Sequence, residues 1–87
     1  MKAVVTVIGK DKVGILAATS QQVAKFNANV IEVTQSVLQE YFAMIMLIDI
    51  SNMKGSIEDL RNALRENVTS MDIHVMHEDI FNSMHRI

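Results

Sequence analysis

Two of the chain's three glycines, Gly9 and Gly14, stand five residues apart on either side of a charged segment that contains Asp11. A helix that begins near Gly14 presents unpaired N–H groups and the positive end of its dipole, which suit a carboxylate or a phosphate. The carboxylate of Asp11 can accept hydrogen bonds from an ammonium group. We expect Asn29 to lie beside this turn, where its amide can donate and accept. These groups together match an amino acid in its zwitterionic form.

The same residues also have a purely local explanation. Asp11 is a residue type favoured as a helix cap. Gly14 is explained equally well if the following helix packs closely on the sheet, and Asn29 if it only ends a turn. The residue types alone therefore leave a ligand site and a structural turn both open.

Other kinds of chemistry find little support in the sequence. Of the three histidines, His74 and His77 point to opposite faces if they lie in a strand, and His85 is close to the C-terminus. No ligand pair has a spacing suited to a metal, so we expect no metal site and no cofactor. No serine or histidine stands in a motif that would pair a nucleophile with an oriented base, so we expect no catalysis. The chain has no cysteine.

Composition narrows the range of partners. The net charge is −2, the aromatic residues are three phenylalanines and one tyrosine, and no basic run occurs, which argues against nucleic acid. The longest apolar run (41–48) is far shorter than the ~20 residues that span a bilayer, and the N-terminus has no signal-peptide pattern. We expect a soluble cytoplasmic protein. A hydrophobic content of 49% in 87 residues favours an oligomer.

The hydrophobic patterning predicts alternating strands and helices. Strands are expected over 2–9, 30–38, 41–50 and 71–78, and helices over 13–27 and 57–68. In the second helix, Ser56 and Asp59 have the spacing of a capping box. In the first, the expected inner stripe is Leu16, Thr19, Val23 and Phe26, and asparagines end the helix.

The order βαββαβ predicts an α+β fold. We expect a ferredoxin-like sandwich, with a four-stranded antiparallel sheet and two helices on one face. We expect residues 1–79 to form this single domain. We expect residues 80–87 to form an amphipathic helix, with Asp79 as its cap, that packs on the domain or on a partner chain.

The strand 41–50 is apolar on both faces and should be covered on both. One face carries Tyr41, Ala43, Ile45 and Leu47, and the other carries Phe42, Met44, Met46 and Ile48. We therefore expect a homodimer that either hides the Met44/Met46 face or joins sheet edges across a twofold axis.

Three segments carry a family resemblance. The stretch GKDKVGIL (9–16) resembles the G-x-D-[RK]-x-G-[IL]-[LV] opening of ACT domains, and NANVIEVTQS (27–36) resembles the segment that follows in that family. The tail HEDIFNSMHRI (77–87) resembles that of a group of small stand-alone prokaryotic ACT proteins of uncharacterised function. The resemblance implies a regulatory module that binds an amino acid or related metabolite, commonly at a subunit interface. By matching position, it implies contacts from Asp11, Lys12, Val13, Gly14, Ile15, Asn29 and Val30.

Position 13 departs from the family pattern: the family often has proline there, and this chain has valine.

Two functions remain open at this point. One is a dimeric sensor that relays ligand binding to a regulated enzyme or regulator protein. The other is a protein–protein interaction or dimerisation module that binds no small molecule.

Overall fold

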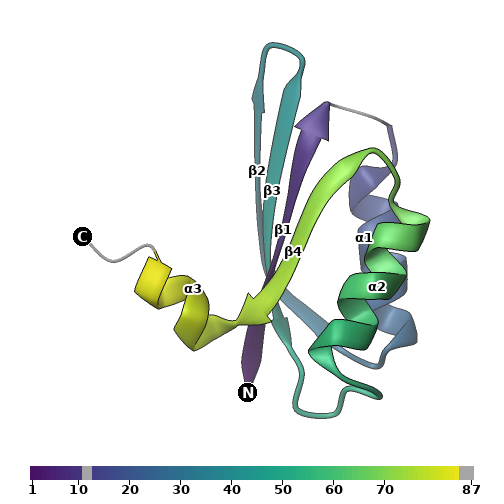
Figure 1. Ribbon diagram of the computed structural model, residues 1–87, viewed down its shortest axis with the longest axis vertical. Helices are drawn as coiled ribbons and strands as arrows, with labels where there is room; N and C mark the ends of the chain where they lie inside the picture. Colours follow the sequence, from purple (N-terminus) through teal and green to yellow (C-terminus); the bar gives the residue numbers. More distant parts are fainter. Residues whose placement is uncertain (11–12, 85–87) are drawn as a thin grey trace.

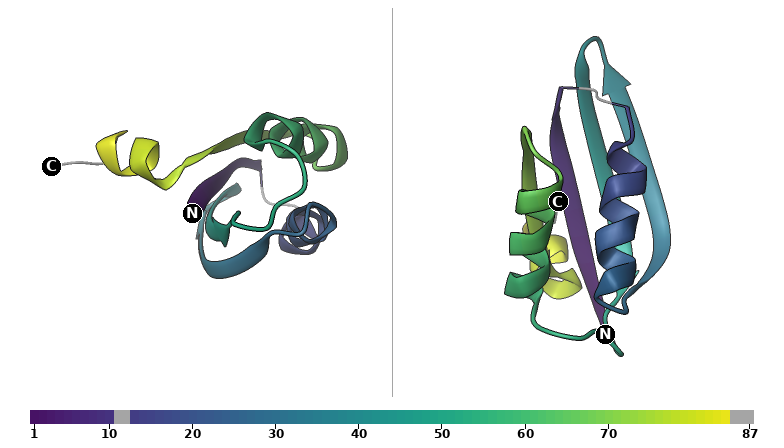
Figure 2. Two further views of the ribbon diagram at one scale, coloured as in Figure 1. Left: turned by 90° about the horizontal axis from the view of Figure 1, so that it is seen from below. Right: turned by 90° about the vertical axis from the view of Figure 1, so that its right-hand side faces the viewer.

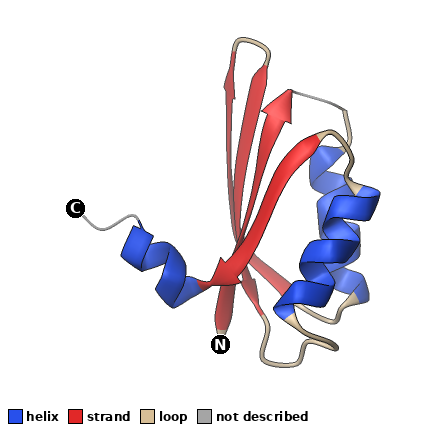
Figure 3. Ribbon diagram, in the orientation of Figure 1, coloured by secondary structure: helices blue, strands red, loops and turns tan. Residues whose placement is uncertain are grey.

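The computed structural model describes residues 1–10 and 13–84 of the chain. The elements follow one another in the predicted order βαββαβ, with a short helix added at the end (Figures 1 and 3). They are β1 (Lys2–Lys10), α1 (Ile15–Lys25), β2 (Asn29–Leu38), β3 (Tyr41–Asp49), α2 (Ile57–Asn67), β4 (Met71–His77) and α3 (Glu78–Met84).

The four strands form one antiparallel sheet in the order β2-β3-β1-β4, so β2 and β4 are its edges. Helices α1 and α2 cover one face, and α3 lies on the opposite side of the sheet, where it contacts β1 and β4 (Figure 2). The predicted ferredoxin-like α+β sandwich is confirmed. None of the described helices has the length and apolar character needed to cross a membrane.

The core lies between the sheet and the two long helices. The inward positions of β3 are filled by Phe42, Met44, Met46 and Ile48, which are all buried. The expectation that a dimer hides the Met44/Met46 face is therefore wrong, because α1 and α2 already cover it. The open face of β3 carries Tyr41, Ala43, Ile45 and Leu47, of which Tyr41 and Ile45 are exposed.

The inner stripe of α1 differs from the prediction by one position. Ile15, Thr19 and Val23 face the core, whereas Leu16 is 37% exposed. The helix begins at Ile15, directly after the left-handed Gly14, and this start places Ile15 rather than Leu16 towards the sheet. The hydroxyl of Thr19 donates to the Ile15 carbonyl at 2.8 Å, which satisfies this buried polar group within the helix.

The predicted start of α2 is confirmed. The Ser56 hydroxyl accepts a hydrogen bond from the Asp59 N–H, and the Asp59 carboxylate accepts one from the Ser56 N–H, each at 3.0 Å. After the end of α1, Asn27 takes a left-handed φ of 59°, as predicted. Helix α3 begins at Glu78, so Asp79 lies inside its first turn and is not the cap.

Candidate functional site

The turn between β1 and α1 contains Gly14, the N-cap residue of α1, with a left-handed φ of 86°. A Cβ added at Gly14 would meet no atom within 4 Å. Close packing of α1 on the sheet therefore does not explain this glycine. The positive φ does, because residues with a Cβ adopt that region at a cost.

The two long helices begin in contrasting ways. Helix α2 has a complete capping box and two acidic residues in its first turn, Glu58 and Asp59. Among the described residues, no side chain caps α1, and its first turn has no acidic residue. The first N–H groups of a helix and the positive end of its dipole attract an anion. Asp11 and Lys12, two of the predicted contacts, lie outside the described residues.

The neighbours of Gly14 contribute differently. Val13 is fully exposed, whereas the side chain of Ile15 is 8% exposed and packs in the core. Ile15 therefore anchors the start of α1, and only its backbone faces the turn. The turn therefore provides two kinds of contact for a ligand: backbone N–H donors and the apolar side chain of Val13.

Asn29 and Val30 lie at the other end of the sheet. Asn29 pairs with Asp49, whereas Lys10, at the end of β1 that leads into the turn, pairs with Tyr41. Eight positions along β3 separate those two partners, a distance of about 26 Å at the usual rise of a strand. The expectation that Asn29 lies beside the turn is wrong within one chain. Helix α1 runs back along the sheet before β2 begins, so β2 starts at the far end (Figure 1).

The two edges of the sheet are not equivalent. On β4, the Arg61 side chain donates to the Val75 carbonyl at 2.7 Å, and the Arg65 side chain donates twice to the Ile73 carbonyl, at 2.9 and 3.2 Å. These arginines occupy outward carbonyls of the edge strand. Strand β2 is exposed along nearly its whole length, with a β-bulge between Val30 and Glu32. The available edge of the sheet is therefore β2.

Sequence reasoning missed both arginines. Their spacing, four residues apart on one face of α2, is the signal that could have found them. Histidine orientation was predicted correctly, because His74 and His77 line separate cavities on opposite faces of the sheet. Within residues 1–10 and 13–84, no group of three or more His, Asp or Glu side chains gathers as metal ligands would.

Comparison with known proteins places this geometry in a family. Residues 2–78 match the family model described as the ACT domain. The chain is 49% identical to the UPF0237 protein of Clostridium perfringens, over the full length of both. A solved ACT domain protein from Streptococcus pneumoniae superposes with a TM-score of 0.76 at 37% identity and 93% coverage of each chain.

A formyltetrahydrofolate deformylase from Pseudomonas syringae aligns with 87% of this chain at a TM-score of 0.75. Only 27% of that enzyme is covered and the identity is 23%, so this likeness concerns the fold alone. The family model and the full-length relative go further than the fold. The chain belongs to the ACT domain family, a family of regulatory ligand-binding modules.

Proposed function

We propose that this protein is a small regulatory sensor that binds an amino acid or a related metabolite at the interface of a homodimer and relays the binding to a partner protein. The observation that carries the proposal is the separation of the predicted contacts. Gly14 and Asn29 lie at opposite ends of one sheet, so one chain alone cannot bring them to a common ligand.

A twofold axis at the β2 edge removes that separation. When β2 pairs with its copy in antiparallel fashion, the Asn29 end of one strand lies beside the Leu38 end of the other. The Leu38 end is also the end of the sheet at which β1 leads into the turn, since Leu38 and Lys10 both pair with Tyr41. Asn29 and Val30 of one subunit thereby approach the Gly14 turn of the other. The exposure of β2 supports this assembly, as does the occupation of the β4 edge by arginines.

The chemistry of such an interface suits a carboxylate. The first N–H groups of α1 donate to it, and the dipole of this eleven-residue helix favours the negative charge. Asp11 would accept from the ammonium group of an amino acid, with Lys12 and Val13 beside it, and the Asn29 amide would reach the ligand from the other subunit. The role is binding rather than catalysis, and we place the protein in the cytoplasm.

A thermal-shift screen against the twenty amino acids, combined with sedimentation, tests the proposal. A ligand at a hundred times its Kd adds about 2.7 kcal/mol to the free energy of unfolding. We expect at least one amino acid to raise the melting temperature of a dimer, and Gly14→Val to abolish that rise. A protein that sediments as a monomer at tens of micromolar would contradict the dimer. If no amino acid or related metabolite binds at millimolar concentration, the sensing role is wrong.

A second function is favoured by a different observation. The open face of the sheet exposes Ile8, Tyr41 and Ile45, and the apolar side chains of Phe81 and Met84 in α3 border the same face. A cavity of about 320 Å³ lies between them. An interaction module without a small-molecule ligand would use this surface. It would give a negative ligand screen together with loss of association when Ile45 is replaced by lysine.

A further inference from the structure

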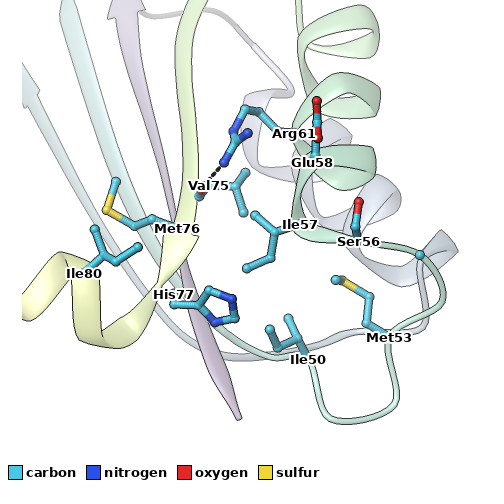
Figure 4. Close-up of a pocket in the computed structure, with 11 residues that line it drawn as sticks. Ile50, Met53, Ser56, Ile57, Glu58, Arg61, Val75, Met76, His77 and Ile80 are labelled. Carbon is cyan, nitrogen blue, oxygen red and sulfur yellow. Dashed lines mark hydrogen bonds between the residues drawn. The ribbon is translucent and has the colours of Figure 1, made fainter.

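A second cavity, distinct from the glycine turn, lies between α2, the end of β4 and the loop that leads into α2 (Figure 4). Its volume is about 540 Å³, within the range of roughly 300–1,000 Å³ that is usual for small-molecule sites. The cavity borders β4 rather than β2. His77, which lines it, pairs with Ala3, and Ala3 pairs with Ile48, so the cavity lies near the end of the sheet opposite to the pair Lys10 and Tyr41. It therefore lies away from the proposed dimer edge and from the Gly14 turn.

Most of the wall of this cavity is apolar. Ile50, Ile57 and Val75 form its interior, with Val75 almost fully buried and the two isoleucines half-buried. Figure 4 shows Ile57 and His77 extending into the space between α2 and β4 from opposite sides. Such a lining receives a compact apolar body, while the polar groups at the rim orient it.

Arg61 is the cationic group of this wall. Its side chain is half-buried, and one terminal nitrogen donates to the Val75 carbonyl at 2.7 Å. Within the described part of the chain, the one ion pair closer than 4 Å joins His74 and Asp72, so no carboxylate neutralises Arg61. A guanidinium has five N–H donors in a planar fork. An arginine in an apolar wall, with most donors uncommitted and its charge unpaired, favours an anion.

The charge at the rim limits that anion. Glu58 also lines the cavity, one turn before Arg61, and its side chain is exposed. Together the two residues contribute one positive and one negative charge. A single carboxylate matches the single cation of Arg61, whereas a second carboxylate would add repulsion from Glu58 with no further arginine or lysine in the lining to offset it.

We propose that this cavity binds a small monocarboxylate with a compact apolar body, its carboxylate held by Arg61 and its body packed on Ile57 and Val75. The shared chemistry is that of a free carboxylic acid and of an apolar amino acid. The two differ in the ammonium group, which only the amino acid would bring near Glu58.

The chain provides a matched control for Arg61. Arg65 lies one turn further along α2 and binds the preceding outward carbonyl of β4, that of Ile73, but it does not line the cavity. If both arginines only cover the edge of β4, Arg61→Gln and Arg65→Gln should have similar effects on ligand affinity. If Arg61 binds the ligand, only Arg61→Gln should lower that affinity.

The experiment is an NMR titration of the full chain with 4-methylpentanoate and, separately, with leucine. 4-Methylpentanamide and acetate serve as controls that lack the charge and the apolar body. We expect one or both of the first two probes to shift the backbone amides of Ile57, Val75 and His77, and neither control to do so. Binding by 4-methylpentanoate alone assigns a free acid, and binding by leucine assigns an amino acid.

Arg61→Gln should weaken this binding roughly ten- to a hundredfold, the effect of losing a charged hydrogen-bond partner. Arg65→Gln should leave the Kd unchanged, and Arg61→Lys should restore part of the affinity. The thermal melting of each variant shows whether it is folded. Equal loss of binding in both glutamine variants, shifts confined to residues 13–15, or no shifts with either probe would overturn the proposal.

Discussion

Gly9 lies directly against Met71, at the point where the end of β1 meets the beginning of β4. A Cβ on Gly9 would stand 2.6 Å from the Met71 sulfur and 3.2 Å from the Ser70 carbonyl oxygen. The two glycines of the opening motif are therefore required for different structural reasons. Gly9 permits close packing, whereas Gly14 permits a left-handed backbone.

Gly9→Ala should destabilise the fold by overpacking, at a cost of about 1–2 kcal/mol. The sulfur is at the flexible part of a side chain, so part of the cost comes from moving it. In the Met71→Ala background, Gly9→Ala should therefore cost less. Urea unfolding of the two single variants and the double variant measures this coupling. Strict additivity would show that the Met71 side chain is not the obstacle.

Gly14→Ala should also destabilise the fold, for a reason that involves no contact. The left-handed φ of 86° costs an alanine about 1–2 kcal/mol, while the added methyl meets open space. Gly14→Asn should cost less, because asparagine tolerates this region better. Chemical denaturation of both variants checks the order. An alanine variant as stable as the wild type would contradict the left-handed turn.

The proposed dimer makes a prediction that separates the sheet edge from the sheet face. Val37, on edge strand β2, is 57% exposed, and Ile45, on the open face of interior strand β3, is 41% exposed. Val37→Lys should shift sedimentation towards the monomer, because two copies of β2 cannot pair without bringing the new charges close to the interface. Ile45→Lys should leave an edge-paired dimer intact. The opposite result would indicate face-to-face association.

A pH effect should arise at the C-terminal end of β3. Hydrogen bonds from Ser51, first from its side chain and then from its backbone N–H, lower the pKa of Asp49 below the ordinary value of an aspartate. The backbone bond measures 2.9 Å. Because the folded pKa lies below the unfolded one, the stabilisation is present above the unfolded pKa. It is lost as the pH falls through the folded value.

Asp49→Asn removes this dependence. We expect the wild type to exceed the variant in unfolding free energy at about pH 6, and the difference to shrink near pH 3. Urea titrations at several pH values measure it. A difference that stays constant over this range would mean that the ionisation of Asp49 does not contribute.

The element order was predictable because strand and helix periodicities differ and because the breaks in the pattern are chemically marked. The Ser56–Asp59 box and the asparagines after α1 are such marks. It was harder to predict which face of each strand or helix points towards the core. Strand β3 is apolar at every position from Phe42 to Ile48, so alternation could not show that Met44 rather than Ile45 faces the helices.

The sequence named candidate contacts residue by residue, but it did not predict how they are arranged in the fold. The position of Asn29 was available in principle, because a crossover helix returns the chain to the end of the sheet at which β1 began. A sequence motif gives the positions of its residues along the chain. It does not show that two of those residues lie at opposite ends of the sheet. Arg61 and Arg65 were missed because their four-residue spacing shows that they share a face of α2 but does not identify the backbone carbonyls that they bind.

The arginines on β4 also bear on how large an assembly can become. A sheet with two open edges can add copies at both sides and has no natural end point. Here α2 occupies outward carbonyls of β4 through Arg61 and Arg65, which leaves growth to the β2 side. In the proposed dimer, the combined sheet would end in a β4 strand at each margin. We therefore expect association through strands to stop at two subunits, with the side chains that cover β4 also opposing polymerisation.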